Sequence, residues 1–178
     1  MTDFRPRLPG SARRLAAIAA LVMLAACASE PPSEPSFYKS LANAGAQVDA
    51  DAAASMISGY RQNNMLGAVT VDPTLMRLAD EQTRAMVARD KLDHNAGRAF
   101  RDRMTASGFD AKVAVENVSA GYHTLAEAFS GWRDSPPHKA NMLKSGVTRM
   151  GIAAVYAPNS KYKVFWTLIL AAPDDGKG

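Results

Sequence analysis

The chain has 178 residues, of which 47% are hydrophobic, a fraction typical of globular proteins. The formal net charge is +4, but four arginines in the first 14 residues account for most of that excess. From residue 27 onward the chain carries 17 basic and 16 acidic side chains and has no basic cluster, which argues against nucleic acid as a partner.

The N-terminal segment has the layout of a bacterial export signal. Its arginines are followed by LAAIAALVMLAAC, an apolar run that is too short to span a membrane, since a spanning helix needs roughly 20 apolar residues. Residues 24–27 (LAAC) resemble the bacterial lipobox, whose cysteine is lipidated. We therefore expect a lipoprotein signal peptide at residues 1–26 and lipidation of Cys27, which binds the protein to a membrane. The alternative is cleavage after the small residues ACA, which would release a soluble secreted protein.

The segment after Cys27 is expected to be a tether. Residues 28–36 (ASEPPSEPS) are rich in Pro, Ser and Glu, a composition typical of semi-extended linkers. We assign residues 27–49 to this tether, 50–172 to one folded domain and 173–178 to a flexible tail. Cys27 is the only cysteine, so the domain has no disulfide and its stability must come from its core.

The first half of the domain is expected to be helical. A helix is predicted over residues 50–64. A second runs from Asp72, an N-cap candidate followed by Pro73, to about Asp90, and places Gln82 on its apolar face. A third covers residues 98–107 and ends at Gly108.

The second half mixes strands with a helix. A short strand is predicted at 113–117, and a fourth helix begins at Thr124 and is ended by Pro136-Pro137. Two strands, 151–156 and 161–171, are joined by an Ala-Pro-Asn-Ser turn. This order of elements predicts an α+β protein in which helices cover a mainly antiparallel sheet.

Three polar residues stand at the ends of elements or in apolar surroundings: His94, Glu116 and His138. A carboxylate in the apolar stretch VAVENV must be paired, protonated or bound to a cation. Two imidazoles and a carboxylate can also bind zinc. Each residue has a structural alternative: His94 as a helix C-terminal cap, Glu116 in an ion pair with an arginine such as Arg98, and His138 packed on the prolines.

The remaining polar and aromatic candidates have simpler interpretations. Ser135 is expected to cap the KANML turn, and His123 to be exposed before a helix. The side-chain amides of Asn117 and Asn141 are expected to hold loops. Four aromatic residues are expected in the core: Phe129, Trp132, Phe165 and Trp166.

Five segments together carry a family resemblance: HNAGR (94–98), VENVSAG (115–121), WRDSPPHKANML (132–143), MGIAAVY (150–156) and VFWTLIL (164–170). In this order they resemble bacterial members of the CAP superfamily, which includes cysteine-rich secretory proteins, antigen 5 and plant pathogenesis-related proteins. The resemblance covers about residues 50–172. It implies a three-layer α-β-α sandwich with a central, mainly antiparallel sheet and a surface cleft.

The resemblance also assigns the cleft residues. His94 and His138 match the two cleft histidines, and Glu116 matches the acid of the G-E-N motif. In some members these side chains bind a divalent metal, which makes Zn²⁺ the candidate cofactor. Two positions depart from the family pattern: Val115 replaces a glycine, and Ser135 stands where eukaryotic members have a second acid. The eukaryotic C-terminal cysteine motif is absent as well.

The function implied is that of a lipid-anchored protein of the bacterial cell envelope, on the periplasmic side of the outer membrane if the source is Gram-negative. Its cleft, lined by His94, Glu116, Ser135 and His138, would bind a lipid, a protein or a divalent metal. The resemblance does not fix a reaction. The alternative is a hydrolase in which Glu116 or a cleft histidine activates a water, with or without zinc.

Overall fold

The structure is a computed structural model that describes residues 33–174, most of a compact unit that begins at Glu34. The expected signal peptide, Cys27 and most of the expected tail lie outside the described residues. The elements are η2 (Ser36–Tyr38), α2 (Ala50–Gln62), β1 (Thr70–Val71), α3 (Pro73–Arg89), α4 (Phe100–Ala106), β2 (Ala111–Ala120), α5 (Leu125–Asp134), α6 (Pro136–Met142), β3 (Arg149–Ala157) and β4 (Lys163–Pro173).

The strands form one sheet in the order β1-β3-β4-β2. β3 and β4 form the expected hairpin, β2 pairs antiparallel with β4, and only β1 runs parallel to its neighbour β3. The expected mainly antiparallel sheet is therefore confirmed. β2 extends from Ala111 to Ala120, beyond the predicted 113–117, and the two-residue strand β1 was not predicted.

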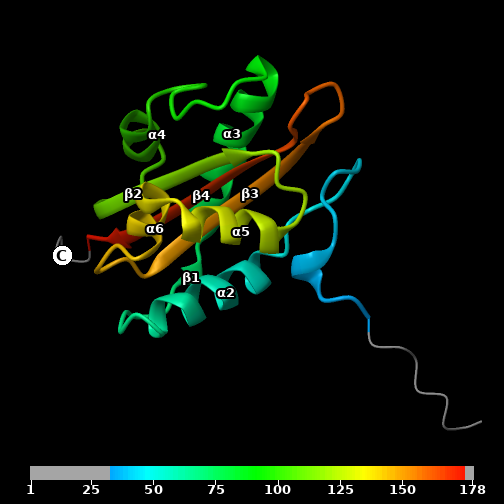
Figure 1. The fold of residues 1–178 in the computed structure, drawn as a ribbon. Coiled ribbons are helices and arrows are strands. Elements are labelled where there is room, and N and C mark those ends of the chain that lie inside the picture. Colours follow the sequence, from blue (N-terminus) through cyan, green and yellow to red (C-terminus); the bar gives the residue numbers. More distant parts are fainter. Residues whose placement is uncertain (1–32, 175–178) are drawn as a thin grey trace, which may run out of the picture. The chain divides into compact units, whose positions relative to one another are not determined.

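Helices cover both faces of the sheet (Figure 1). On one face, Ile57 of α2, Trp132 of α5 and Met142 of α6 pack in one apolar cluster with β3 and β4 residues. On the other face, Leu75 and Leu78 of α3 pack with Met104 of α4 against β3 and β4. The expected three-layer α-β-α sandwich is confirmed. Trp132, Phe165 and Trp166 are buried in this core, and Phe129 is half-buried against it.

Two helices begin where their capping residues predict. The Asp72 carboxylate accepts hydrogen bonds from the N–H groups of Thr74 and Leu75, at 2.8 and 3.0 Å, and Pro73 opens α3. At the start of α5, Thr124 and Glu127 form a reciprocal capping box. Each cap satisfies N–H groups that the helix itself leaves unpaired.

The prolines at 136–137 end one helix and begin the next. α5 stops at Asp134 as predicted, but Pro136 and Pro137 then open α6 instead of a loop. Proline fits the first helical turn because the N–H that it lacks has no partner there. His138 therefore lies on a helix, and its interpretation as a loop residue is wrong. Ser135 is the N-cap residue of α6, but its side chain makes no capping hydrogen bond, so the predicted cap is wrong too.

The compact unit includes residues that the sequence assigned to the tether. Leu41 is buried, its N–H donates to the carbonyl oxygen of His123 at 2.7 Å, and Phe37 packs against the main apolar cluster. Residues 34–49 thus belong to the folded unit, because their few apolar side chains reach the core. The His123 side chain is exposed just before α5, as expected.

Candidate functional site

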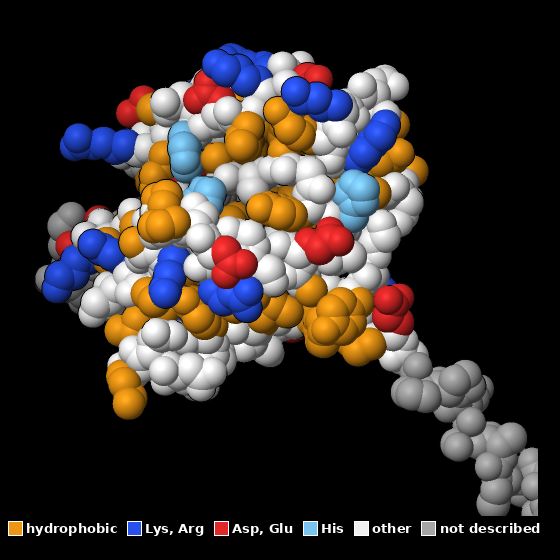
Figure 2. Space-filling view, viewed as in Figure 1, with side chains coloured by type: hydrophobic (Ala, Val, Ile, Leu, Met, Phe, Trp, Pro, Cys, Tyr) orange, Lys and Arg blue, Asp and Glu red, His pale blue; other side chains and the backbone are white. Residues whose placement is uncertain are grey.

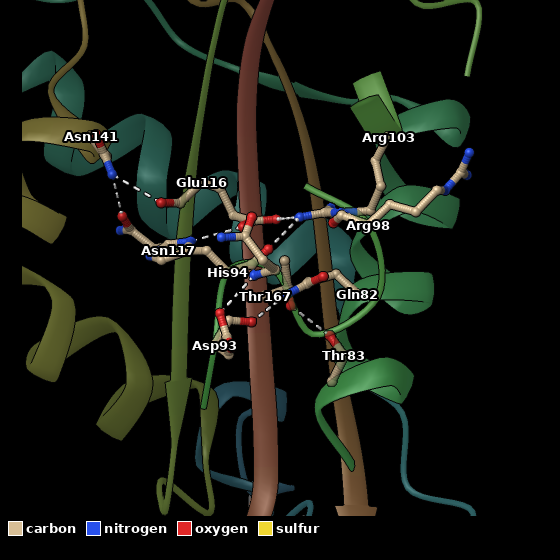
Figure 3. A network of polar contacts seen from close by, with 11 residues as sticks. Gln82, Thr83, Asp93, His94, Arg98, Arg103, Glu116, Asn117, Asn141 and Thr167 are labelled. Carbon is tan, nitrogen blue, oxygen red and sulfur yellow. Dashed lines mark hydrogen bonds and ion pairs between the residues drawn. The ribbon is translucent and has the colours of Figure 1, made fainter. Parts of the chain in front are cut away.

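Glu116 lies on β2 with its side chain only 2% exposed, and both of its carboxylate oxygens have partners. Oε1 lies 2.9 Å from Nδ1 of His94, and Oε2 accepts a hydrogen bond of 2.7 Å from Nη2 of Arg103 (Figure 3). The buried carboxylate is therefore paired on both sides, which offsets the cost of removing it from water.

Arg103 is the residue that the sequence interpretation missed. Its guanidinium, 1% exposed, also donates to the carbonyl oxygens of Arg98 and His94, at 3.1 and 3.2 Å. The arginine proposed as the partner of Glu116 was Arg98, whose side chain instead forms an ion pair of 3.3 Å with Glu81 at the surface. A signal was present: Phe100, Arg103 and Met104 share one helical face, which favours burial of Arg103 beside the two apolar residues.

His94 is held at the surface by the buried carboxylate behind it. Its side chain is 50% exposed, and the contact with Glu116 uses Nδ1, which leaves Nε2 as the nitrogen available to a ligand. The hydrogen bond to Glu116 raises the pKa of His94 above its ordinary value. His94 does not cap α3, which ends at Asp90 in a left-handed conformation.

His138 lies on α6, and its backbone is bonded to β2 next to Glu116. The amide of Asn117, next to Glu116 on the strand, donates to the backbone oxygen of His138 at 3.0 Å. Asn141 donates to the backbone oxygen of Glu116 at 3.0 Å and to the Asn117 side chain at 2.9 Å. Both amides bond backbone oxygens as expected, but these oxygens lie in α6 and β2 and not in loops. Burial, with a further contribution from the charge of His94, lowers the pKa of His138.

A second layer of polar residues lies behind the histidine loop. Gln82 of α3 is fully buried and donates to the carbonyl oxygen of Asp93 at 2.7 Å, while Thr83 bonds Thr167 of β4 at 2.8 Å (Figure 3). Among the described buried side chains, only Gln82 Oε1 and Arg103 Nη1 lack a hydrogen-bond partner. The buried side chains of Gln82 and Arg103 thus fix the loop that carries His94 through its backbone oxygens.

The site does not fit a metal ion. No group of three His, Cys, Asp or Glu side chains within residues 33–174 is arranged to hold one. Glu116, the only carboxylate of the expected set, already uses one oxygen for Arg103 and the other for His94. The Ser135 hydroxyl makes no hydrogen bond to any described residue and is not drawn into this network.

The site lies at the surface, where the His94 side chain is half exposed. Histidine side chains reach the face shown in Figure 2, among hydrophobic groups. Two grooves of more than 500 Å³ lie elsewhere among the described residues, one between α4 and the start of β2 and the other beside β3, and neither is lined by His94, Glu116 or His138.

Residues 54–170 match the model of the CAP family, described as the cysteine-rich secretory protein family. The chain belongs to this family. The CAP fold and the Arg103–Glu116–His94 chain of contacts thus occur in one domain, which spans about two thirds of the sequence.

Relatives of this CAP protein are found in other bacteria. An uncharacterized Bacillus subtilis protein, YkwD, is 29% identical over 103 residues, which cover 56% of this chain and 40% of YkwD. The chain therefore spans well under half of that relative's length.

Two solved structures share the fold. An extracellular SCP-domain protein of Bacillus anthracis has a TM-score of 0.60 at 19% identity, covering 68% of this chain and 39% of that one. An outer surface protein of Borrelia burgdorferi has a TM-score of 0.62 at 17% identity, covering 72% and 98%. In this CAP protein, none of the helices in residues 33–174 is both long and apolar enough to cross a membrane.

Proposed function

We propose that this CAP protein is an exported binding protein of the cell envelope, held to a membrane through lipidated Cys27. Its exposed histidine site would bind a ligand through an acceptor oxygen, such as a carboxylate or phosphate group. The observation that supports this proposal is the buried contact chain from Arg103 through Glu116 to His94. Two structural relatives are an extracellular protein and an outer surface protein, which supports export.

The charges at the site favour a ligand with an acceptor oxygen over a cationic ligand. The carboxylate of Glu116 is matched by the guanidinium of Arg103, so a protonated His94 leaves the cluster with a net positive charge. The raised pKa of His94 extends the pH range in which it is protonated. Since Nδ1 of His94 is bound to Glu116, the outward-facing Nε2–H is the donor that a ligand would meet.

The proposal is tested by titrating the purified protein with acetate, phosphate and a soluble short-chain phosphatidylglycerol while the imidazole NMR signals are followed. We expect shifts of the His94 and His138 signals and about tenfold weaker binding in His94→Gln. His123→Gln is the matched control, because His123 is exposed outside the contact chain. If none of the three probes shifts His94 or His138, the acceptor-binding proposal is wrong.

The second candidate function is hydrolysis. It has one supporting observation: Glu116 orients the His94 ring as a carboxylate orients a catalytic histidine, leaving Nε2 free to act as a base. Among the described residues, no hydroxyl or thiol side chain forms a hydrogen bond with His94. An activity against peptide, ester or peptidoglycan substrates that is lost in Glu116→Gln would favour the hydrolase over the binding protein.

The membrane anchor is tested separately by Cys27→Ser. The substitution should move the protein from the membrane fraction to the soluble exported fraction, because the lipid chains are the only attachment proposed. An unchanged membrane fraction would show that Cys27 is not the anchor.

A further inference from the structure

The outer edge of β3 is paired only at its first residues. β1 pairs with Arg149 and Met150, and then the chain leaves the sheet. The N–H of Asp72 donates to the carbonyl oxygen of Met150 at 2.8 Å, so the backbone groups of Met150 point outward from β3. The N–H and C=O groups of successive residues point alternately to the two edges of a strand. The backbone groups of every second residue after Met150 therefore point outward as well.

These residues are Ile152, Ala154 and Tyr156. The N–H of Ile152 faces the sulfur of Met76 at 3.2 Å. Five outward backbone groups have no hydrogen-bond partner within the described part of the chain: the C=O of Ile152 and the N–H and C=O of both Ala154 and Tyr156. Ala154 and Tyr156 are only half-buried, so this stretch of edge is accessible.

A groove of about 540 Å³ runs along this unpaired edge. The groove is lined by β3 from Ile152 to Tyr156 and by the segment 43–48, which lies between η2 and α2 in the chain. Met76 lines the groove with the exposed ion pair of Asp80 and Arg84, whose atoms are 2.7 Å apart. The volume lies within the range of ligand-binding pockets.

We propose that this groove binds an extended peptide segment of a partner protein, which pairs with β3 as an additional strand. The outward N–H and C=O groups of Ala154 and Tyr156 alternate at the spacing that an extended backbone matches. Strand addition of this kind takes its affinity from main-chain hydrogen bonds and its specificity from pockets for alternate side chains. Asp80 and Arg84 offer a charge of each sign to the side chains of the added strand.

Other occupants fit the groove less well. An acyl chain would bury the free backbone groups of β3 without partners, at a cost of about 1–3 kcal/mol for each group. A second copy of the chain could extend the sheet only by bringing a whole sheet edge against β3. The segment 43–48 lines the groove beside β3, so a second sheet edge would have to pass this segment, whereas a single extended strand is a smaller occupant.

The test begins with selection of linear ten-residue peptides from a display library against the purified protein. Affinities of the selected peptides are then compared in two variants. Ala154→Pro removes the outward N–H, and proline is tolerated at an edge position whose N–H faces solvent. Ala154→Val keeps that N–H and is the matched control. We expect Ala154→Pro to weaken binding about tenfold or more, and Ala154→Val to change it less than about threefold.

A second measurement needs no protein variant. N-methylation is scanned along the best selected peptide, and we expect it to abolish binding at every second residue only, because alternate N–H groups face β3. If every selected peptide binds Ala154→Pro as tightly as the parent, or if methylation has no alternating effect, strand addition is wrong. Binding of palmitate that competes with the peptides and is indifferent to Ala154→Pro would likewise assign the groove to lipid and overturn the proposal.

Discussion

Glu116 and Arg103 form an ion pair in which both side chains are buried. Oε2 of Glu116 and Nη2 of Arg103 are 2.7 Å apart, and the side chains are 2% and 1% exposed, respectively. The pair joins the central sheet to α4, and through the carbonyl oxygen of His94 it also fixes the loop that carries that histidine. The exposed site therefore depends on charges that never reach the surface.

Replacing Arg103 by methionine should destabilise the protein by about 3–5 kcal/mol, because it leaves the Glu116 carboxylate buried without its charged partner. Equilibrium unfolding in urea measures the loss. Arg98→Met is the matched control, since the exposed ion pair of Arg98 with Glu81 should contribute no more than about 1 kcal/mol. Equal losses in the two variants would contradict a special role for the buried pair.

The two site histidines should titrate on opposite sides of the ordinary value of 6.5. NMR titration of the imidazole signals should place the pKa of His94 above 6.5, because of the hydrogen bond to Glu116, and that of His138 below it, because of burial. In Glu116→Gln the pKa of His94 should fall, since the charged acceptor is lost. A His94 pKa that does not move in this variant would show that Glu116 does not set it.

Because of these shifts, each histidine contributes to the free energy of unfolding in a different pH range. A raised pKa means that the folded state holds the proton more tightly, so the contribution of His94 is present below pH 6.5 and is lost as the pH rises through its folded pKa. His138 has a lowered pKa, so its contribution is present above pH 6.5 and is lost as the pH falls through its folded pKa. The free energy of unfolding should therefore be measured against pH in His94→Gln and His138→Gln. We expect His94→Gln to lose stability at low pH and His138→Gln to lose it at high pH.

Much of the fold could be predicted from local signals, and most of the site could not. Asp72, Pro73 and the apolar spacing after them define α3 without reference to the rest of the chain. β1 is only two residues long and exists because β3 lies beside it, so no local pattern indicates it. The contact between Glu116 and Arg103 likewise depends on how α4 packs against β2, although the helical spacing of Arg103 from Phe100 indicated that it is buried.

Gly151→Ala should strongly destabilise the protein. A Cβ at this position of β3 would lie 2.1 Å from the carbonyl carbon of Leu75, so the backbones of α3 and the sheet touch where no side chain fits. We expect a loss of about 3 kcal/mol or more, at the upper end of the cost of overpacking, because the clash is with backbone. Thermal unfolding provides the measurement.

Gly59→Ala in α2 is the matched control for Gly151→Ala. Its added Cβ meets no atom within 4 Å, and alanine favours a helix over glycine by up to about 1 kcal/mol. The same chemical change should therefore raise stability in α2 and lower it in β3. A neutral result for Gly151→Ala would mean that α3 can move away from β3 at little cost.

Arg61 should be the most sensitive position of α2. Its buried guanidinium, on a residue 1% exposed, donates to the carbonyl oxygens of Gly67, Met142, Lys144 and Val147 over distances of 2.8–3.1 Å. These oxygens lie in the loop after α2, at the last residue of α6 and in the segment that follows it, so one side chain joins two chain regions and satisfies carbonyls at the end of a helix.

Arg61→Met should therefore cost more than about 4 kcal/mol, since each hydrogen bond to a charged group is worth about 1.5–3 kcal/mol and the carbonyls of Met142 and Val147 would stay buried without a donor. Arg61→Lys should restore only part of this loss, because an ammonium group cannot reproduce the planar fork of donors. Arg133→Met on the exposed surface of α5 is the control and should change stability by less than about 0.5 kcal/mol. Full stability in Arg61→Lys would show that the charge alone, without the fork of donors, holds α6 against α2.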